Sequence, residues 1–340
     1  MHVCNCSTLT TMNEQQHWIN QIVDSPTDLS LRAVYADWLD ESGDVDRAKF
    51  VRELSSAIES LGPNTQLPAI EGDVAWTNML GLPLLQGVIK QQAGRCQEIL
   101  TLARPSVTIT TKRLRSGKDK TEIGSSKFLG EPDLPSDVPW PRCEYGPLAF
   151  LAQIDMSEIS TSQVCRYLPS FGILSFFGFS DAEEGIEPGF GIDDDVKIFW
   201  FPNADGLVRT PAPSDVNELA ETCSPAALEF VETWDLPSVG DAVSPHMVSA
   251  MAAFEKDDDD WEILHDMRVG LNGCGNHLGG YSCHFRTDDL DPGAEWNHIL
   301  CLDSDRNTPW SWCDGEHLAL YVHEEDLANK TFNRIIASAS

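Results

Sequence analysis

Hydrophobic side chains recur at helical spacing in the first sixty residues of the chain. The pattern predicts a first helix over Gln15 to Val23, a second whose N-cap is Asp28, and a third that begins at Arg47. Residues 1–11 lack this pattern and are expected to form a disordered tail. The sequence therefore predicts a small helical module over residues 12–61.

Glycines and prolines interrupt residues 62–104, which we interpret as a linker with one helix from Pro83 to Ala103. From Val107 the pattern changes to alternating, β-branched positions that are typical of strands. The predicted fold is α+β: a small N-terminal helical module, followed by a larger, mainly antiparallel β-sheet domain over residues 105–340.

Two distant stretches of this second domain resemble one another. Each has a glycine turn, an apolar run that ends in a carboxylate, and a second apolar run after another glycine. Gly130 precedes Asp155 by 25 residues, and Gly279 precedes Asp303 by 24. The sequence thus predicts an internal duplication, with halves at roughly residues 126–200 and 270–340, in which Asp155 and Asp303 have related environments.

The charge of the chain limits its partners. With 23 basic and 54 acidic residues in 340, the formal net charge is -31, which disfavours nucleic acid and anionic membrane surfaces and favours a basic partner. The sequence has no apolar run long enough for a membrane span and no secretory signal, so a cytoplasmic protein is expected. The oligomeric state stays open.

A segment of the helical module resembles a known family. Residues 31–52 contain the string Leu-Arg-Ala-Val-Tyr-Ala-Asp-Trp-Leu-Asp-Glu, then Gly43-Asp44 and Arg47-Ala48-Lys49-Phe50-Val51-Arg52. This string is similar to the repeat-companion domain of planctomycete and myxobacterial proteins. The resemblance covers roughly residues 12–61 and implies no particular activity.

The second domain resembles another family. The blocks that carry the similarity include Ser126-Lys127-Phe128-Leu129-Gly130, Phe150-Leu151-Ala152-Gln153-Ile154-Asp155 and Ile299-Leu300-Cys301-Leu302-Asp303. They resemble the YwqG-like family of unknown function over roughly residues 105–338. The resemblance implies a bacterial α+β domain rich in antiparallel sheet, with an immunity-protein-like binding role.

Cysteines and histidines gather near the C-terminus at spacings that zinc sites use. Cys274, His277, Cys283 and His284 are the candidate metal ligands. His298 and Cys301 fall in a predicted strand, where positions three apart point to opposite faces and cannot chelate together. We therefore expect no cofactor, with zinc kept as an alternative.

A possible binding surface combines aromatic, acidic and glycine residues: Trp310, Trp312, Asp303, Asp305, Gly279 and Gly280. Exposed tryptophans would form a platform for a partner protein, whereas buried ones would belong to the core of the sheet.

No catalytic residue is assigned, because the sequence lacks a Gly-x-Ser-x-Gly nucleophile turn and a phosphate-binding loop with its lysine. The leading hypothesis is a non-enzymatic protein-binding module with an acidic surface. The alternatives are a metal-dependent or cysteine-based hydrolase that uses the Cys274 to His317 region, and a structural module without a specific ligand.

Overall fold

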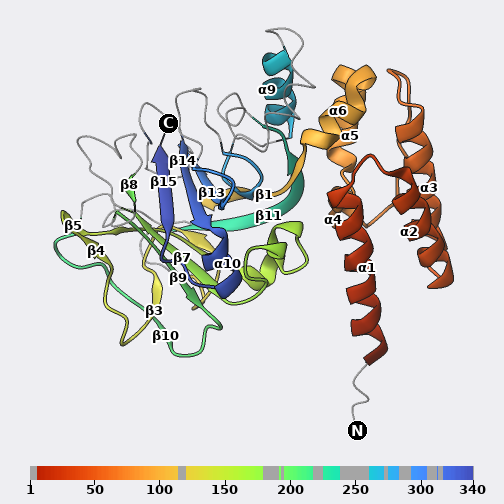
Figure 1. Ribbon diagram of the computed structural model, residues 1–340. Helices are drawn as coiled ribbons and strands as arrows, with labels where there is room; N and C mark the ends of the chain where they lie inside the picture. The colour runs from red at the N-terminus through yellow and green to blue at the C-terminus, as the bar shows by residue number, and fades with distance from the viewer. Residues whose placement is uncertain are drawn as a thin grey trace.

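The computed structural model consists of N-terminal helices followed by a large antiparallel sheet (Figure 1). It describes residues 6–113, 120–178, 191–192, 195–216, 225–237, 260–271, 275–282, 292–304, 312 and 317–339. The predicted α+β class is confirmed. Among these residues, the helices lack the combination of length and hydropathy that crossing a bilayer requires.

Six helices build the N-terminal part: α1 (Cys6–Asp24), α2 (Leu29–Glu41), α3 (Val45–Glu59), α4 (Val74–Met79), α5 (Leu82–Gln92) and α6 (Cys96–Leu102). Asp28 caps α2 as predicted, since its carboxylate accepts a hydrogen bond from the backbone N–H of Ser30 at 2.8 Å. Asp44 caps α3 in the same manner through the N–H of Arg47.

The predicted boundaries of two of these helices were wrong. Helix α1 begins at Cys6, so residues 6–11 are helical and not a tail. The threonines at its start cost only a few tenths of a kcal/mol each, which extension of an existing helix can overcome. The helix predicted from Pro83 to Ala103 is divided by a 3-10 turn at Ala93–Arg95, where Gly94 weakens the helix.

In the described part of the chain, the main sheet has eleven strands in the order β8-β15-β14-β13-β12-β1-β11-β2-β6-β7-β9. Its longest strands are β1 (Arg104–Arg113), β6 (Ala149–Asp155), β7 (Ile173–Gly178), β9 (Val196–Phe201), β11 (Ala226–Asp235), β13 (Trp296–Asp303), β14 (His317–His323) and β15 (Ile335–Ala339). The short ones are β2 (Lys127–Phe128), β8 (Gly191–Ile192) and β12 (His277–Gly279). All the described pairings are antiparallel.

Smaller elements flank the sheet: β3 (Asp133–Pro135) pairs with β10 (Leu207–Arg209), and β4 (Arg142–Cys143) with β5 (Gly146–Pro147). The connections include the 3-10 turns η2 (Met156–Ile159) and η3 (Gln163–Arg166) and the helices α9 (Asp260–Gly270) and α10 (Glu324–Asn329). The sheet curls until β15 contacts β9, so that it is nearly a barrel around one apolar core.

The two halves of the sheet repeat one another. Strands β2-β6-β7-β9 follow β11 outwards, and strands β12-β13-β14-β15 follow β1 outwards in the same order. Asp155 and Asp303 are the last residues of β6 and β13, and each pairs with the first residue of the next strand. Their backbone N–H groups donate to Ser126 Oγ at 2.8 Å and Asn276 Oδ1 at 2.9 Å. The predicted internal duplication is confirmed by these matching environments.

The register corrects one detail of that duplication. Lys127 pairs with Gln153, and His277 pairs with Cys301. Since Lys127 matches His277, Gly130 matches Gly280 and not Gly279. The equivalent distances to the aspartates are 25 and 23 residues (155 minus 130 and 303 minus 280). The loop between the glycine turn and the strand is therefore two residues shorter in the second copy.

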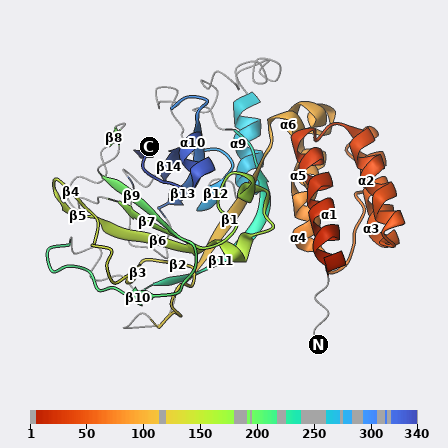
Figure 2. The same ribbon diagram turned by 60° about the horizontal axis from the view of Figure 1, so that its bottom comes forward.

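The helical part packs against the sheet domain beside β1 and β11 (Figure 2). One apolar cluster contains Leu84, Leu85 and Ile99 of the helices together with Trp234 of β11 and Leu264 of α9. Such a shared core makes the two parts one continuous structure in the described residues.

Candidate functional site

His277, the central residue of the predicted zinc site, is fully buried and already occupied on both sides of its ring. Its Nδ1 lies 2.6 Å from the carbonyl oxygen of Gly275, and its Nε2 lies 2.9 Å from that of Tyr281. Each ring nitrogen therefore faces a backbone carbonyl oxygen at hydrogen-bond distance, which ties the ring into the fold.

The other predicted zinc ligands, Cys274, Cys283 and His284, lie outside the described residues. Within the described part of the chain, no group of three or more His, Cys, Asp or Glu side chains could hold a metal ion. His298 instead contacts the Gly279 carbonyl oxygen through Nδ1 at 2.8 Å.

Gly279 and Gly280 form the tight turn that the sequence indicated. Close packing and positive φ angles explain why both positions are glycine. Their φ angles are 68° and 64°, and a Cβ on Gly279 would lie 2.4 Å from the hydroxyl of Tyr167. A Cβ on Gly280 would lie 2.7 Å from Asp235 Oδ2. The N–H of Gly280 donates to the carbonyl of Pro105 at 3.1 Å, so this amide is not presented to a ligand.

The aromatic and acidic residues predicted for a binding surface are separated by burial. Trp312 is 2 % exposed and belongs to the apolar core, which is the second of the two interpretations that the sequence left open. Asp303 is partly exposed and lies 3.3 Å from His317 Nε2. Trp310 and Asp305 are outside the described residues.

Two buried ionic clusters brace the sheet. Asp235 forms a bidentate ion pair with Arg268, at 2.8 and 2.9 Å, and accepts the N–H of Tyr281. Asp133 binds Arg209 at 2.6 Å and lies 3.7 Å from the buried Nζ of Lys127. Each carboxylate oxygen in these clusters is bonded within the folded protein. We therefore assign Asp235 and Asp133 a structural role and no catalytic or ligand-binding role.

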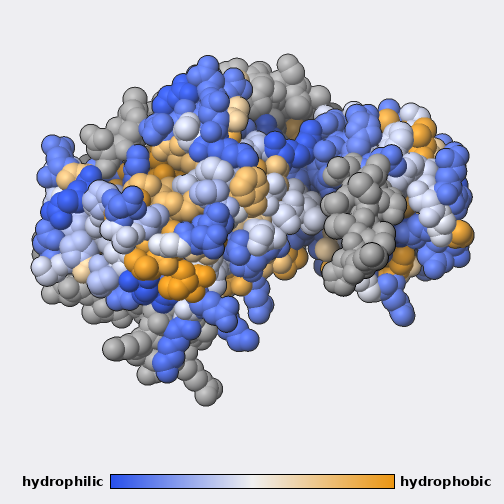
Figure 3. All heavy atoms as spheres, turned by 90° about the horizontal axis from the view of Figure 1, so that it is seen from below, coloured by the Kyte–Doolittle hydropathy of each residue, from blue (hydrophilic) through white to orange (hydrophobic). Residues whose placement is uncertain are grey.

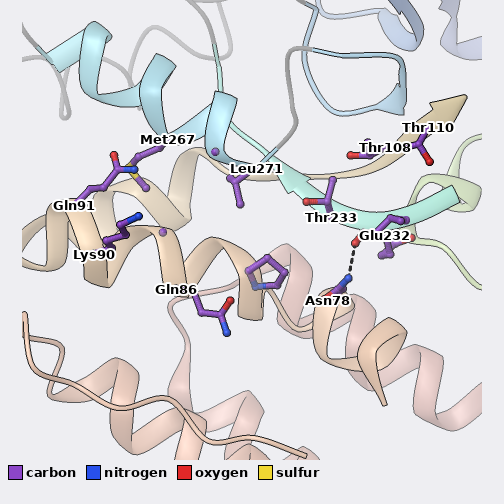
Figure 4. Close-up of a pocket in the computed structure, with 14 residues that line it drawn as sticks. Asn78, Gln86, Lys90, Gln91, Thr108, Thr110, Glu232, Thr233, Met267 and Leu271 are labelled. Carbon is purple, nitrogen blue, oxygen red and sulfur yellow. Dashed lines mark hydrogen bonds between the residues drawn. The ribbon is translucent and has the colours of Figure 1, made fainter. Parts of the chain in front are cut away.

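A cleft opens where the helical part meets the sheet domain (Figure 4). It has a volume of about 380 Å³, within the usual range for ligand sites. Its walls come from α4 and α5, from the outer face of β1 and β11, and from the end of α9. The lining residues are Asn78, Pro83, Gln86, Gly87, Lys90, Gln91, Thr108, Thr110, Val231, Glu232, Thr233, Met267, Gly270 and Leu271.

Most of the polar groups in this cleft are uncharged. Gln86, Gln91 and Thr108 have no hydrogen-bond partner for their side chains within the described part of the chain. Asn78 is committed to structure, because its amide donates to the carbonyl oxygen of Glu232 at 2.9 Å. The cleft therefore offers amide and hydroxyl groups that are ready to bond a ligand, with Lys90 as an exposed cation at its edge.

Carboxylates surround the cleft. Glu229 is exposed on the outer face of β11, two residues from Val231. Glu262 and Asp266 are exposed on α9, about two turns and one turn respectively before Gly270, which lines the cleft. These three carboxylates thus add negative charge near the cleft, while Lys90 and Lys112, which is exposed on β1 two residues from Thr110, add positive charge.

Glu232 has an unusual environment on the opposite face of β11. Strand alternation directs its side chain towards η3, away from the face that carries Val231 and Thr233. Its carboxylate accepts the N–H of Gln163 at 3.2 Å, yet burial raises its pKa to about 7. On the cleft side, Glu232 contributes its backbone carbonyl oxygen, which accepts the hydrogen bond from Asn78.

One face of the molecule illustrates the surface away from the cleft. Figure 3 shows one face of the molecule, which is mostly hydrophilic and carries a hydrophobic patch on the sheet domain. Phe171 is among the exposed apolar side chains at 43 %, and the Nζ of Lys330 lies 4.3 Å from its ring.

Sequence reasoning did not find the cleft. Its walls come from four regions of the chain that are far apart, at residues 78–91, 108–110, 231–233 and 267–271. Threonine and glutamine at these positions form no motif. The only local signal was the alternating pattern of β1, which leaves one face polar.

Comparison with known proteins places the sheet domain in a family. Residues 126–339 match the family described as Domain of unknown function (DUF1963). The chain belongs to this family. The match to DUF1963 begins after β1, so that helices α1 to α6 and β1 lie outside it. A search of the curated proteins found no match. In this chain the cleft therefore has one wall from the DUF1963 region, with β11 and α9, and another from residues that precede it.

Proposed function

We propose that this protein is a non-enzymatic, cytoplasmic binding protein whose partner is a basic protein, and that the cleft is the point of contact. The observation that carries the proposal is the net charge of -31 together with the exposed carboxylates Glu229, Glu262 and Asp266 around a preformed cleft. A polyanion attracts cationic partners at long range and speeds their encounter.

The resemblances add two narrower proposals. Residues 12–61 would serve as a repeat-companion module that completes the cleft, and the sheet domain would have an immunity-like role as a YwqG-like protein. Both agree with a protein that binds rather than transforms its partner. They rest on sequence similarity and on the position of α4 and α5 beside β11.

Lys90 allows a direct test of the charge that the cleft prefers. A lysine-rich and a glutamate-rich fluorescent peptide of equal length would be titrated with the protein at 50 and 200 mM salt. We expect the lysine-rich peptide to bind, with an affinity that falls as salt screens the charges.

Reversing the charge in Lys90→Glu should tighten this binding about fivefold, because each unit charge at ~8 Å in water contributes about 0.5 kcal/mol. The control is Lys49→Glu, an exposed lysine of α3 that changes the net charge equally but is not a residue of the cleft. Preference for the glutamate-rich peptide, or equal effects of the two substitutions, would contradict the proposal.

A further inference from the structure

We propose that the cleft recognises the main chain of an extended, basic peptide segment laid along the outer face of β1 and β11. This inference rests on the proposed function and specifies which part of the partner enters the site. It depends on the kind, spacing and charge of the groups that line the cleft.

The free polar groups match a peptide backbone. Gln86 and Gln91 each offer an N–H donor and a carbonyl acceptor, and Thr108 offers a hydroxyl that does both. None of the three side chains has a hydrogen-bond partner among the described residues. A peptide main chain presents donors and acceptors in turn, so this set can pair with it whatever its side chains are.

The spacing of the sheet face matches an extended ligand. Thr108 and Thr110 on β1, and Val231 and Thr233 on β11, line the cleft at every second position. Positions two apart on a strand are separated by roughly 6.6 Å, which is also the repeat of side chains along an extended peptide. Alternate side chains of such a segment would therefore meet the cleft and the solvent.

The cleft also separates apolar from charged contacts. Val231 of β11 is the apolar lining residue that is exposed, at 46 %, and gives an apolar surface for an inward side chain, whereas Met267 and Leu271 of α9 are almost fully buried. Glu229, on the same face of β11 two residues from Val231, and Asp266 of α9 are exposed beside the lining residues. A segment with an apolar residue over Val231 and basic residues on either side of it would match both kinds of group.

The test starts from a displayed library of random nine-residue peptides selected against the full-length protein. The strongest peptide would be synthesised unmodified and with two positions that are two residues apart N-methylated, which removes backbone donors on one side of the extended chain but keeps the side-chain charges. Each form would be titrated with the wild type, with Gln86→Ala/Gln91→Ala and with Gln97→Ala. Gln97 is an exposed glutamine on α6 that does not line the cleft.

We expect basic peptides to be selected and N-methylation to weaken wild-type binding about tenfold, the loss of one to two hydrogen bonds. The double variant should bind the unmodified peptide about tenfold more weakly and show little further loss on N-methylation, whereas Gln97→Ala should behave as wild type. Basic peptides that ignore both N-methylation and the double substitution would overturn this inference alone. Selection of acidic peptides, or of none, would overturn the proposed function as well.

Discussion

Glu232 should make the stability of the protein fall with rising pH near neutrality. Its carboxyl is buried between β11 and η3, and burial raises its pKa from the ordinary 4.5 to about 7. In the folded chain the group holds its proton up to about pH 7, whereas the unfolded chain releases it near pH 4.5. Stability is therefore unaffected below the lower value and declines as pH rises through this window, until the loss is complete above pH 7.

The size of the loss follows from the shift. One pKa unit corresponds to 1.36 kcal/mol, so a shift of about 2.5 units gives a loss of roughly 3 kcal/mol, as an upper bound. Glu232→Gln removes the ionisation and keeps the shape of the side chain. We expect the variant to match the wild type at pH 4.5 and to exceed its free energy of unfolding by about 2 to 3 kcal/mol at pH 8.

The assay is urea unfolding followed by tryptophan fluorescence at intervals from pH 4.5 to pH 8.5. Glu229→Gln is the control, because Glu229 is on the same strand but exposed on the opposite face, and its substitution removes the same charge. A wild type and a Glu232→Gln variant that lose stability in parallel above pH 5 would refute this account of the buried carboxyl, as would an equal gain from Glu229→Gln.

Three further substitutions test the packing that surrounds the predicted site. Asp235→Ala leaves the buried Arg268 without its counterion and should cost about 3 to 5 kcal/mol in chemical unfolding, whereas exchange of both residues for apolar ones should cost much less. Gly280→Ala should lower the melting temperature by several degrees, because its φ is 64° and the new Cβ would press on Asp235; Gly87→Ala, in an open position of helix α5, should be neutral or stabilising. Trp312→Ala should lower the free energy of unfolding by about 3 to 5 kcal/mol, because the Trp312 ring fills the core. A loss below about 1 kcal/mol would show that the ring is exposed instead.

Local patterns predicted the parts of the fold that local interactions determine. The N-cap Asp28 and the alternation from Val107 depend on neighbouring residues, so the sequence alone located them. The cap of α3 by Asp44 was not predicted, because the third helix was expected to begin at Arg47 and not at Val45. The duplication was also visible, but its register was displaced by one residue because two consecutive glycines offer two alignments. Only the pairing of His277 with Cys301 decides between them.

Contacts between distant segments were not predictable in this way. His277 looked like a metal ligand because its neighbours in sequence include cysteines, whereas its actual partners are two backbone carbonyl groups and the nearby Asp235. Burial decides whether a histidine, lysine or tryptophan is structural or available for binding. That property emerges only when β12, β13 and α9 come together.

The position of the cleft follows from where the repeat of the sheet is broken. The two halves meet at the pair β1 and β11, and the apolar core fills the inner side of both. The outer side of this pair is a single surface with no second copy, and α4 and α5 cover one end of it from outside the DUF1963 region. The two repeated halves therefore form the sheet, and the helices α4 and α5 cover one polar face of it to make a cleft of about 380 Å³. A binding function that depends on this cleft would belong to the combination of helices and sheet and would be absent from the sheet domain alone.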